Sequence, residues 1–180
     1  MLWRIVRFIA GLIIGVALWW TCADVWNHPL ASMAQPLVHI DRRLRDCELN
    51  AVGRTIVVQP LRDTMPLANI PADQLTYNVI LVIALFASNR APFSDRNLRA
   101  FAIAFIILLL LHPIGLFVSI ESTYANQLGD WSDQHYGDTA AHIWINVEVF
   151  YRLIGMFGVA FAAWWIGSAD RINASPSSRT

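Results

Sequence analysis

The sequence predicts an all-α membrane protein with four transmembrane helices and a small outer (periplasmic) α+β insertion between the first and second helices. Three observations lead to this prediction. Hydrophobic residues make up 56% of the 180 residues and charged residues only 14%, an unusual balance for a soluble domain. The apolar residues are concentrated in blocks, each near the roughly 20 residues that cross the hydrocarbon of a bilayer. Arginine is unequally distributed between the short segments connecting these blocks.

Residues 1–26 form the first predicted transmembrane helix. Arg4 and Arg7 precede an uninterrupted apolar stretch, and Trp19 and Trp20 close it, as in the aromatic belt of a membrane interface. A positive start followed by a short apolar stretch is also typical of a secretory signal. We favour an uncleaved helix because bulky tryptophans close before a cleavage site are a poor context for cleavage.

Residues 71–88, 100–120 and 141–167 form the other three predicted helices. The apolar run of the second, Val79 to Ala87, is short, and the helix reaches crossing length only when it is counted from a proline suited to a first turn. The third is almost wholly apolar. The fourth carries tryptophans near both ends, as expected for an aromatic girdle at each interface.

The arginine distribution predicts the orientation in a bacterial inner membrane. The link 89–99 holds three arginines, whereas the loop 121–140 holds no arginine or lysine and four acids. By the positive-inside rule the link is cytoplasmic and the loop periplasmic, so both termini are cytoplasmic, including the tail 168–180, which we expect to be disordered. The outer region 27–70 also carries arginines, but nearby acids match them, and a region of this length has less weight in setting orientation.

The outer region 27–70 contains two predicted elements. Apolar residues recur every three or four positions from Leu37 to Ala51, which predicts an amphipathic helix at about 37–50. A β-branched run at about 54–59 predicts a strand. One strand needs a partner, and the candidate is the segment 62–67, although its proline disfavours pairing.

Polar residues inside the predicted helices are the candidate functional group. Glu148 and Arg152 are spaced i and i+4, and an unpaired charge in hydrocarbon costs roughly 2.5 to 3.5 kcal/mol, so we expect them to pair. By residue counting, His112 lies at a depth similar to that of Glu148, with Asn78 and Tyr77 close enough to contribute. Such a cluster is either a proton relay, substrate pocket or acid–base set, or a group that joins helices. We favour helix joining because the sequence offers no activated nucleophile or metal ligand set.

Cys22 and Cys47 both fall on the outer side in this topology, where oxidation is possible. A disulfide between them would tie the amphipathic helix to the top of the first transmembrane helix. We favour two unpaired apolar thiols over this disulfide, because the sequence alone does not show whether the two Cα atoms lie close enough to be bridged.

Small residues mark two helix faces. Gly11 and Gly15 permit close approach of another helix to the first transmembrane helix, and Gly155 and Gly158 form a similar stripe on the fourth. Both stripes favour packing, either within the bundle or against a partner.

Composition excludes several classes of protein. The formal net charge is zero, which gives no indication of a nucleic-acid partner. Two cysteines do not supply a zinc knuckle, an iron–sulfur site or a CxxC pair. We therefore assign no catalytic residue, no metal site and no cofactor, and the one partner implied by composition is membrane lipid.

The order of features resembles the exosortase H-associated membrane protein family. The resemblance covers nearly the whole chain, through weak motifs: the tryptophan-rich first helix, the strand Arg54–Gln59, Thr76-Tyr77-Asn78 opening a helix that ends Ala84–Ser88, an arginine-bearing link, a polar break at His112, and Tyr151–Gly155 in the last helix. It implies an accessory role in an envelope protein-sorting system, beside an exosortase-like membrane transpeptidase that processes C-terminal sorting signals. It implies no catalytic function, because neither cysteine lies in a motif resembling the exosortase nucleophile.

Our leading hypothesis is a non-enzymatic inner-membrane accessory or scaffold protein associated with an exosortase-type sorting system. The alternative is a membrane-embedded enzyme or transport component that uses His112, Glu148 and Arg152.

Overall fold

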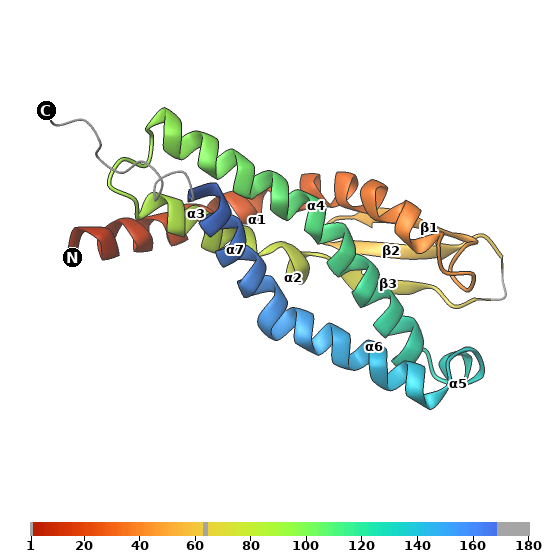
Figure 1. The fold of residues 1–180 in the computed structure, drawn as a ribbon. Coiled ribbons are helices and arrows are strands. Elements are labelled where there is room, and N and C mark those ends of the chain that lie inside the picture. Colours follow the sequence, from red (N-terminus) through yellow and green to blue (C-terminus); the bar gives the residue numbers. More distant parts are fainter. Residues whose placement is uncertain (1, 63–64, 169–180) are drawn as a thin grey trace, which may run out of the picture.

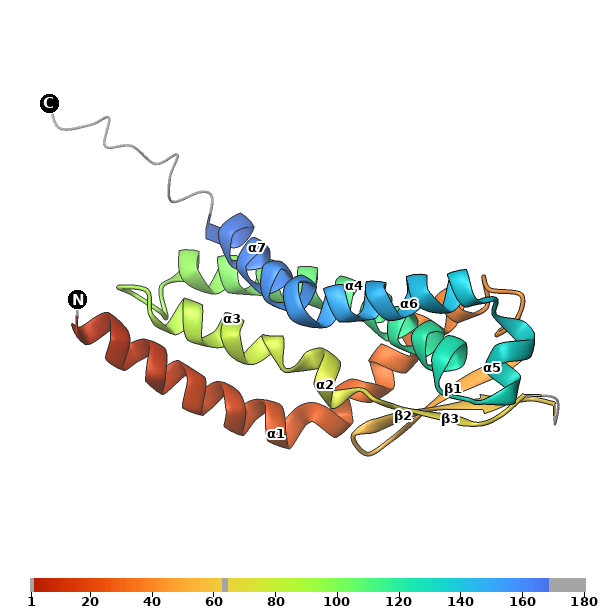
Figure 2. The ribbon, with the colours of Figure 1, turned by 90° about the horizontal axis from the view of Figure 1, so that it is seen from below.

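The computed structural model describes residues 2–62 and 65–168. Of the predicted disordered tail 168–180, residues 169–180 lie outside the described residues. Three long helical rods lie side by side in an elongated bundle (Figures 1 and 2). They are α1 (Leu2–Val38), α4 (Asp95–Asn126), and a third rod made of α6 (Asp138–Phe150), the π-helical turn η1 (Tyr151–Gly155) and α7 (Met156–Ser168). A shorter segment, α2 (Asp73–Thr76) followed by α3 (Asn78–Ala87), packs between them.

The two ends of the bundle differ. One, the sheet end, carries three strands and the short helix α5 (Asp130–His135), and the other, the link end, carries the α3–α4 connection (Figure 2). The chain runs along α1 to the sheet end, returns along α2 and α3, runs out again along α4, and returns along α6 and α7. Leu2 and Ser168 therefore both lie at the link end.

The three long rods have the length and composition of membrane-spanning helices. The 37 residues of α1 and the 32 residues of α4 reach about 55 Å and about 48 Å, more than the roughly 30 Å of hydrocarbon. Their outward faces expose many large apolar side chains, and a soluble protein rarely exposes so large a continuous apolar surface to water. Examples from each rod are Ile9, Ile13, Ile14, Ile106, Leu110, Leu153 and Ile154. The protein is therefore a membrane-embedded, multi-pass protein.

The segment predicted as the second transmembrane helix is shorter and is divided. α2 and α3 together cover Asp73–Ala87, about 22 Å of helix at about 1.5 Å per residue. Tyr77 separates the two parts. This length is below the roughly 30 Å of hydrocarbon that a transmembrane helix crosses, whereas each of the three long rods exceeds it.

The strands form one antiparallel sheet in the order β1 (Cys47–Val52), β2 (Thr55–Pro60) and β3 (Ala68–Pro71). β1 and β2 form a hairpin with Val52 opposite Thr55, so its loop has two residues. Gly53, the first of them, has a φ of +57°, a left-handed conformation that favours glycine in tight hairpin turns.

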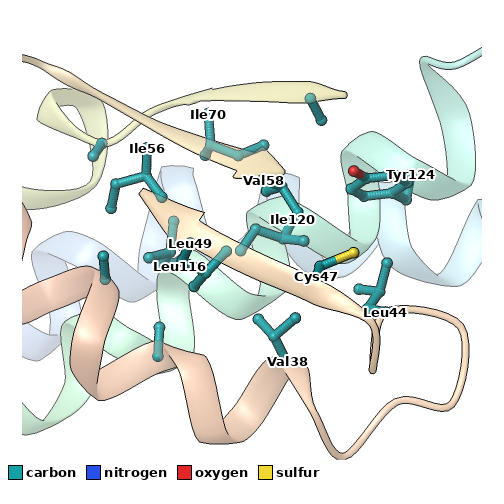
Figure 3. Packing of buried hydrophobic residues seen from close by; sticks show 14 of the residues in the cluster. Val38, Leu44, Cys47, Leu49, Ile56, Val58, Ile70, Leu116, Ile120 and Tyr124 are labelled. Carbon is teal, nitrogen blue, oxygen red and sulfur yellow. The ribbon is translucent and has the colours of Figure 1, made fainter. Parts of the chain in front are cut away.

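One face of the sheet is buried against helices α1 and α4 (Figure 3). Alternate strand residues point into this core, as the period of two in a strand requires. The core includes Val38, Leu44, Cys47, Leu49, Ile56, Val58, Ile70, Leu116, Ile120 and Tyr124. A second, smaller core around Val82, Phe86, Ala104 and Leu108 lies nearer the link end.

A side chain of α1 covers the free edge of β1. The Gln35 amide donates to the Cys47 carbonyl at 2.7 Å, and its oxygen accepts the Leu49 N–H, also at 2.7 Å. An unpaired strand edge is prone to unwanted pairing, and this glutamine satisfies it as a further strand would. Asn27, two turns earlier on α1, donates to the Gly53 carbonyl at 2.8 Å and holds the hairpin loop.

The predicted amphipathic helix at about 37–50 is wrong. α1 continues through Pro29 and Pro36 to Val38, turns follow, and Cys47–Val52 is a strand. Of the apolar positions that suggested a helical stripe, Leu44 is buried in the turns and Cys47 is buried in the strand, whereas Ile40 is 75% exposed. The β-branched strand β2 needed a neighbour, and pairing with β1 supplies it.

Other predicted boundaries differ in a related way. β2 lies where the sequence predicted a strand at about 54–59, but its partners are β1 and β3 rather than the segment 62–67. The predicted loop 121–140 is largely helical, because α4 continues to Asn126 and α5 follows. The outer parts of α1 and α4 stay helical beyond the predicted spans because the sheet packs against them.

Candidate functional site

Glu148 and Arg152 form an ion pair between the third rod and its neighbours. Arg152 lies 2.7 Å from the Glu148 carboxylate, and Ser119 of α4 donates to the same carboxylate oxygen at 2.9 Å. The guanidinium also donates to Gln74 of α2 at 2.8 Å. Glu148 is buried and Arg152 is half-buried. One charge pair therefore connects α6, η1, α4 and α2.

His112 and Asn78 form a second polar pair. His112 Nε2 lies 2.8 Å from the Asn78 side-chain oxygen, and the Asn78 amide donates to the Met156 carbonyl at 3.3 Å. Both side chains are buried. The Trp26 ring packs edge-on against the imidazole, with the ring centroids 6.0 Å apart. This pair connects α4, α3 and α7.

The structure thus divides the predicted five-residue cluster. Among the residues described, no hydrogen bond or ion pair joins His112 to Glu148 or Arg152. Glu148 meets Ser119, seven residues and about 10 Å farther along α4 than His112, so the predicted equal depth is wrong. The residue count assumed that both helices begin at the same level, whereas α4 extends past residue 120 and α6 begins at Asp138.

Tyr77 belongs to neither polar pair. Its ring packs edge-on against Phe157, with centroids 6.3 Å apart. It therefore contributes aromatic packing between the α2–α3 segment and α7.

Sequence reasoning missed Ser119 and Gln74. A lone serine in an apolar helix carries little signal, but Ser119 lies seven residues from His112 and so on the same helix face. No contact was predicted for Tyr151, yet its ring lies directly over Gly115 of α4, so close that any side chain at Gly115 would displace it.

The two glycine stripes have different surroundings. A Cβ at Gly11 would lie 2.7 Å from the Cβ of Ala87 and 2.8 Å from the Cα of Ala84, and one at Gly15 would lie 3.1 Å from Ile80. At the first stripe α1 and α3 thus lie in close contact. A Cβ at Gly155 would meet Tyr151 of its own rod, and a Cβ at Gly158 would meet no atom of another helix within 4 Å. The second stripe does not pack inside the bundle.

The two cysteines are free and differ in exposure. Cys22 is exposed on α1, whereas Cys47 is buried in the sheet core and its thiol donates to the Met65 sulfur at 3.3 Å. Burial, and then the nearby Asp46, raises the pKa of Cys47 to about 11. The possible disulfide between Cys22 and Cys47 is therefore not formed, and the two thiols are unpaired, as we expected.

A buried carboxyl group lies at the sheet end, beyond the predicted third span. Glu121 is fully buried and accepts a hydrogen bond from the Tyr136 hydroxyl at 2.8 Å. Burial raises the pKa of Glu121 to about 7, and Asp41 adds to this effect while Tyr136 and Arg43 oppose it. Arg43 in turn lies over the Tyr136 ring, 4.2 Å from its centroid.

The described contacts of these groups join helices. Glu148 is paired with Arg152 of η1 and accepts a hydrogen bond from Ser119 of α4, while Arg152 also donates to Gln74 of α2. Residues 2–62 and 65–168 contain no group of three potential metal ligands. An apolar cavity of about 250 Å³ between α1, α3 and α4 includes Cys22 and Thr76 in its lining but no carboxylate or histidine.

Comparison with known proteins yields no match to a family model, to a curated protein or to a solved structure.

Proposed function

We propose that the chain is a non-enzymatic accessory or scaffold protein of the bacterial inner membrane. The observation that carries this proposal is the use of its intramembrane polar groups: Glu148 and Arg152 bond across four elements, and His112 bonds through Asn78 to a helix backbone. Such bonds fix the positions of helices relative to one another. A rigid bundle bearing a packed sheet at one end suits a protein that presents a surface to a partner.

The proposed topology has four crossings, both termini in the cytoplasm and the sheet in the periplasm. α1 and α4 run in the same direction, so the chain between them returns along α2 and α3, and this return is the proposed short crossing. The link end carries Arg4, Arg90 and Arg96, as expected on the cytoplasmic side. At the other side, Arg54 of the hairpin stacks on Trp20, 3.5 Å from its ring centroid, at the level of an interfacial belt.

The proposed partner is an exosortase-like membrane transpeptidase. The support is the family resemblance, together with exposed apolar side chains at the sheet end that lie outside the long helical rods. Leu61 and Leu67 are 62% and 54% exposed, beside the strands rather than on a lipid-facing helix. Apolar side chains placed in this way suit a contact with another protein.

Site-specific photo-crosslinking followed by co-purification in mild detergent tests this proposal. A photoreactive residue at Leu61 or Leu67 is expected to capture a transpeptidase subunit. The same residue at Phe93, which is 86% exposed at the link end, serves as the matched control. Recovery of an exosortase-like subunit supports the proposal. If the chain purifies alone in every preparation and no protein is cross-linked to it at the sheet end, the proposal is contradicted.

Two observations favour the second candidate, a membrane-embedded enzyme or transport component. Arg152 lies in the π-helical turn η1, and π-helical turns are frequent at functional sites. His112 Nδ1 is buried without a hydrogen-bond partner among the described residues.

A Glu148→Gln variant, assayed in cells that process C-terminal sorting signals, separates the two candidates. The scaffold proposal predicts that any loss of sorting follows a loss of protein abundance, because the residue holds helices together. Loss of sorting with normal abundance and normal folding would favour the second candidate.

A further inference from the structure

A cavity of about 530 Å³ opens at the link end, where four parts of the chain meet. Its wall is formed by the start of α1, the end of α3, the connection to α4 together with the first turn of α4, and one residue of α7. The polar and aromatic lining includes Arg4, Asn89, Arg90, Ser94, Arg96 and Trp164. None of these residues belongs to the two polar pairs described above.

Three arginines, Arg4, Arg90 and Arg96, line this cavity, and none has a carboxylate partner among the residues that the structure describes. The ion pairs found among residues 2–62 and 65–168 involve Arg43, Arg62 and Arg152, and none involves Arg4, Arg90 or Arg96. Asp95 adjoins Arg96 in the chain, but it is not part of the lining. Positive charge gathered in a concave site attracts an anion.

Hydrogen bonds hold the wall of the cavity in place. Arg7 donates to the carbonyls of Asn89 and Arg90, at 2.9 Å and 2.8 Å, and so fixes the connection against α1. Asn89 donates to Asn97 at 2.7 Å, and Asn97 donates to the Pro92 carbonyl, also at 2.7 Å. A site whose backbone is already fixed loses less conformational entropy when it binds a ligand.

The start of α4 and an indole complete the site. Ser94 is the N-cap residue of a 32-residue helix, whose N-terminal end favours negative charge. Trp164 of α7 forms another part of the wall. Tryptophan is typical of the headgroup level of a membrane. In the proposed topology, on which this inference rests, the cavity therefore combines phosphate-binding chemistry with a position at the cytoplasmic surface of the membrane.

We infer that this cavity binds the phosphate of an anionic phospholipid headgroup, of the phosphatidylglycerol class. Arginine suits this ligand because its planar guanidinium donates two parallel hydrogen bonds to phosphate oxygens. The headgroup enters from the membrane surface while its acyl chains stay among the apolar outer faces of the helices. Inorganic phosphate offers the same oxygens without an anchoring chain.

The test is a binding titration of the purified full chain in a neutral detergent. The probes are a short-chain phosphatidylglycerol, the matching phosphatidylcholine and inorganic phosphate. Phosphatidylglycerol is expected to bind about tenfold more tightly than either other probe. The triple variant Arg4→Gln/Arg90→Gln/Arg96→Gln is expected to lose this preference. The control Arg42→Gln/Arg45→Gln/Arg62→Gln removes the same charge at the sheet end and is expected to keep it.

A single variant keeps the test decisive if the triple variant does not fold. Arg90 lies outside the helices, so Arg90→Gln preserves the bundle, and it is expected to weaken phosphatidylglycerol binding about threefold. Equal binding of phosphatidylglycerol and phosphatidylcholine, or binding unchanged in the variants that fold, would overturn the inference. Inorganic phosphate binding as tightly as phosphatidylglycerol would overturn the assignment to lipid.

Discussion

Arg152 lies 2.7 Å from Glu148, one turn earlier along the same rod, while its guanidinium reaches Gln74 on the neighbouring α2 segment. The pair is partly desolvated, because Glu148 is buried and the Arg152 side chain is 35% exposed. Removing one partner leaves a charge without its counter-ion in a medium of low polarity, whereas removing both does not.

The first prediction concerns this ion pair. Glu148→Gln alone is expected to lower the free energy of unfolding by about 2 kcal/mol, less than for a fully buried pair because Arg152 retains contact with solvent. The double variant Glu148→Gln/Arg152→Gln is expected to recover part of this loss. Unfolding in mixed micelles of dodecyl maltoside and sodium dodecyl sulfate measures both. Strictly additive effects of the two substitutions would show that the pair is not coupled.

The second prediction concerns the contact between α1 and α3. Gly11→Ala is expected to cost about 1 to 3 kcal/mol of stability, because the added Cβ meets the backbone of Ala84. Gly158→Ala is the matched control: open space surrounds the added methyl group, so this substitution is expected to leave stability unchanged or to raise it by up to about 1 kcal/mol through the better helix propensity of alanine. The same mixed-micelle titration compares them. Equal stability of the two variants would mean that α1 and α3 do not approach at Gly11.

The third prediction is a pH dependence that arises from Glu121. Its pKa of about 7 in the folded chain lies above the ordinary value of 4.5, so the folded state binds the proton more tightly than the unfolded state. The free energy of unfolding is therefore expected to fall as pH rises from about 4.5 to about 7, by roughly 3 kcal/mol, and then to level off. Glu121→Gln should remove this component. If the free energy of unfolding changes with pH in the same way in the wild type and in Glu121→Gln, the assignment of this pH dependence to Glu121 is wrong.

The fourth prediction concerns the two thiols. In the folded protein a small maleimide is expected to modify the exposed Cys22 and to leave the buried Cys47 unmodified, because burial keeps the Cys47 thiol protonated and inaccessible. Both should react after denaturation. Intact-mass spectrometry without reductant counts the modified sites. A mass two hydrogens lighter, with neither thiol reactive before reduction, would reveal a disulfide and contradict the structure.

The apolar blocks carry most of the information that sequence provides about this fold. The three longest correspond to the rods α1, α4 and α6–α7, because hydrocarbon length is a strong constraint on composition. The strand β2 was also visible, through its β-branched residues. β1 was not, because Cys47, Leu49 and Ala51 alternate weakly and lie beside apolar positions that also fit a helical period.

The candidate site was predictable only in part, since residue counting gives no relative height of helices. Glu148 and Arg152 pair as their spacing predicts, because i and i+4 positions face one another on any helix. His112 pairs with Asn78 rather than with Glu148 because of the relative heights of α4 and α6 in the bundle, which tertiary packing determines. The link-end cavity likewise depends on how four segments converge.

The most direct test of the account is the accessibility of single cysteines on the two ends of the bundle. Gln134 at the sheet end and Phe93 at the link end are exposed positions, and each is replaced by cysteine in a background carrying Cys22→Ala and Cys47→Ala. A membrane-impermeant maleimide is predicted to label position 134 in cells whose inner membrane is intact and position 93 only after that membrane is permeabilised. Labelling of both positions before permeabilisation, or of position 93 alone, would contradict a bundle that crosses the membrane with its sheet outside and its link inside.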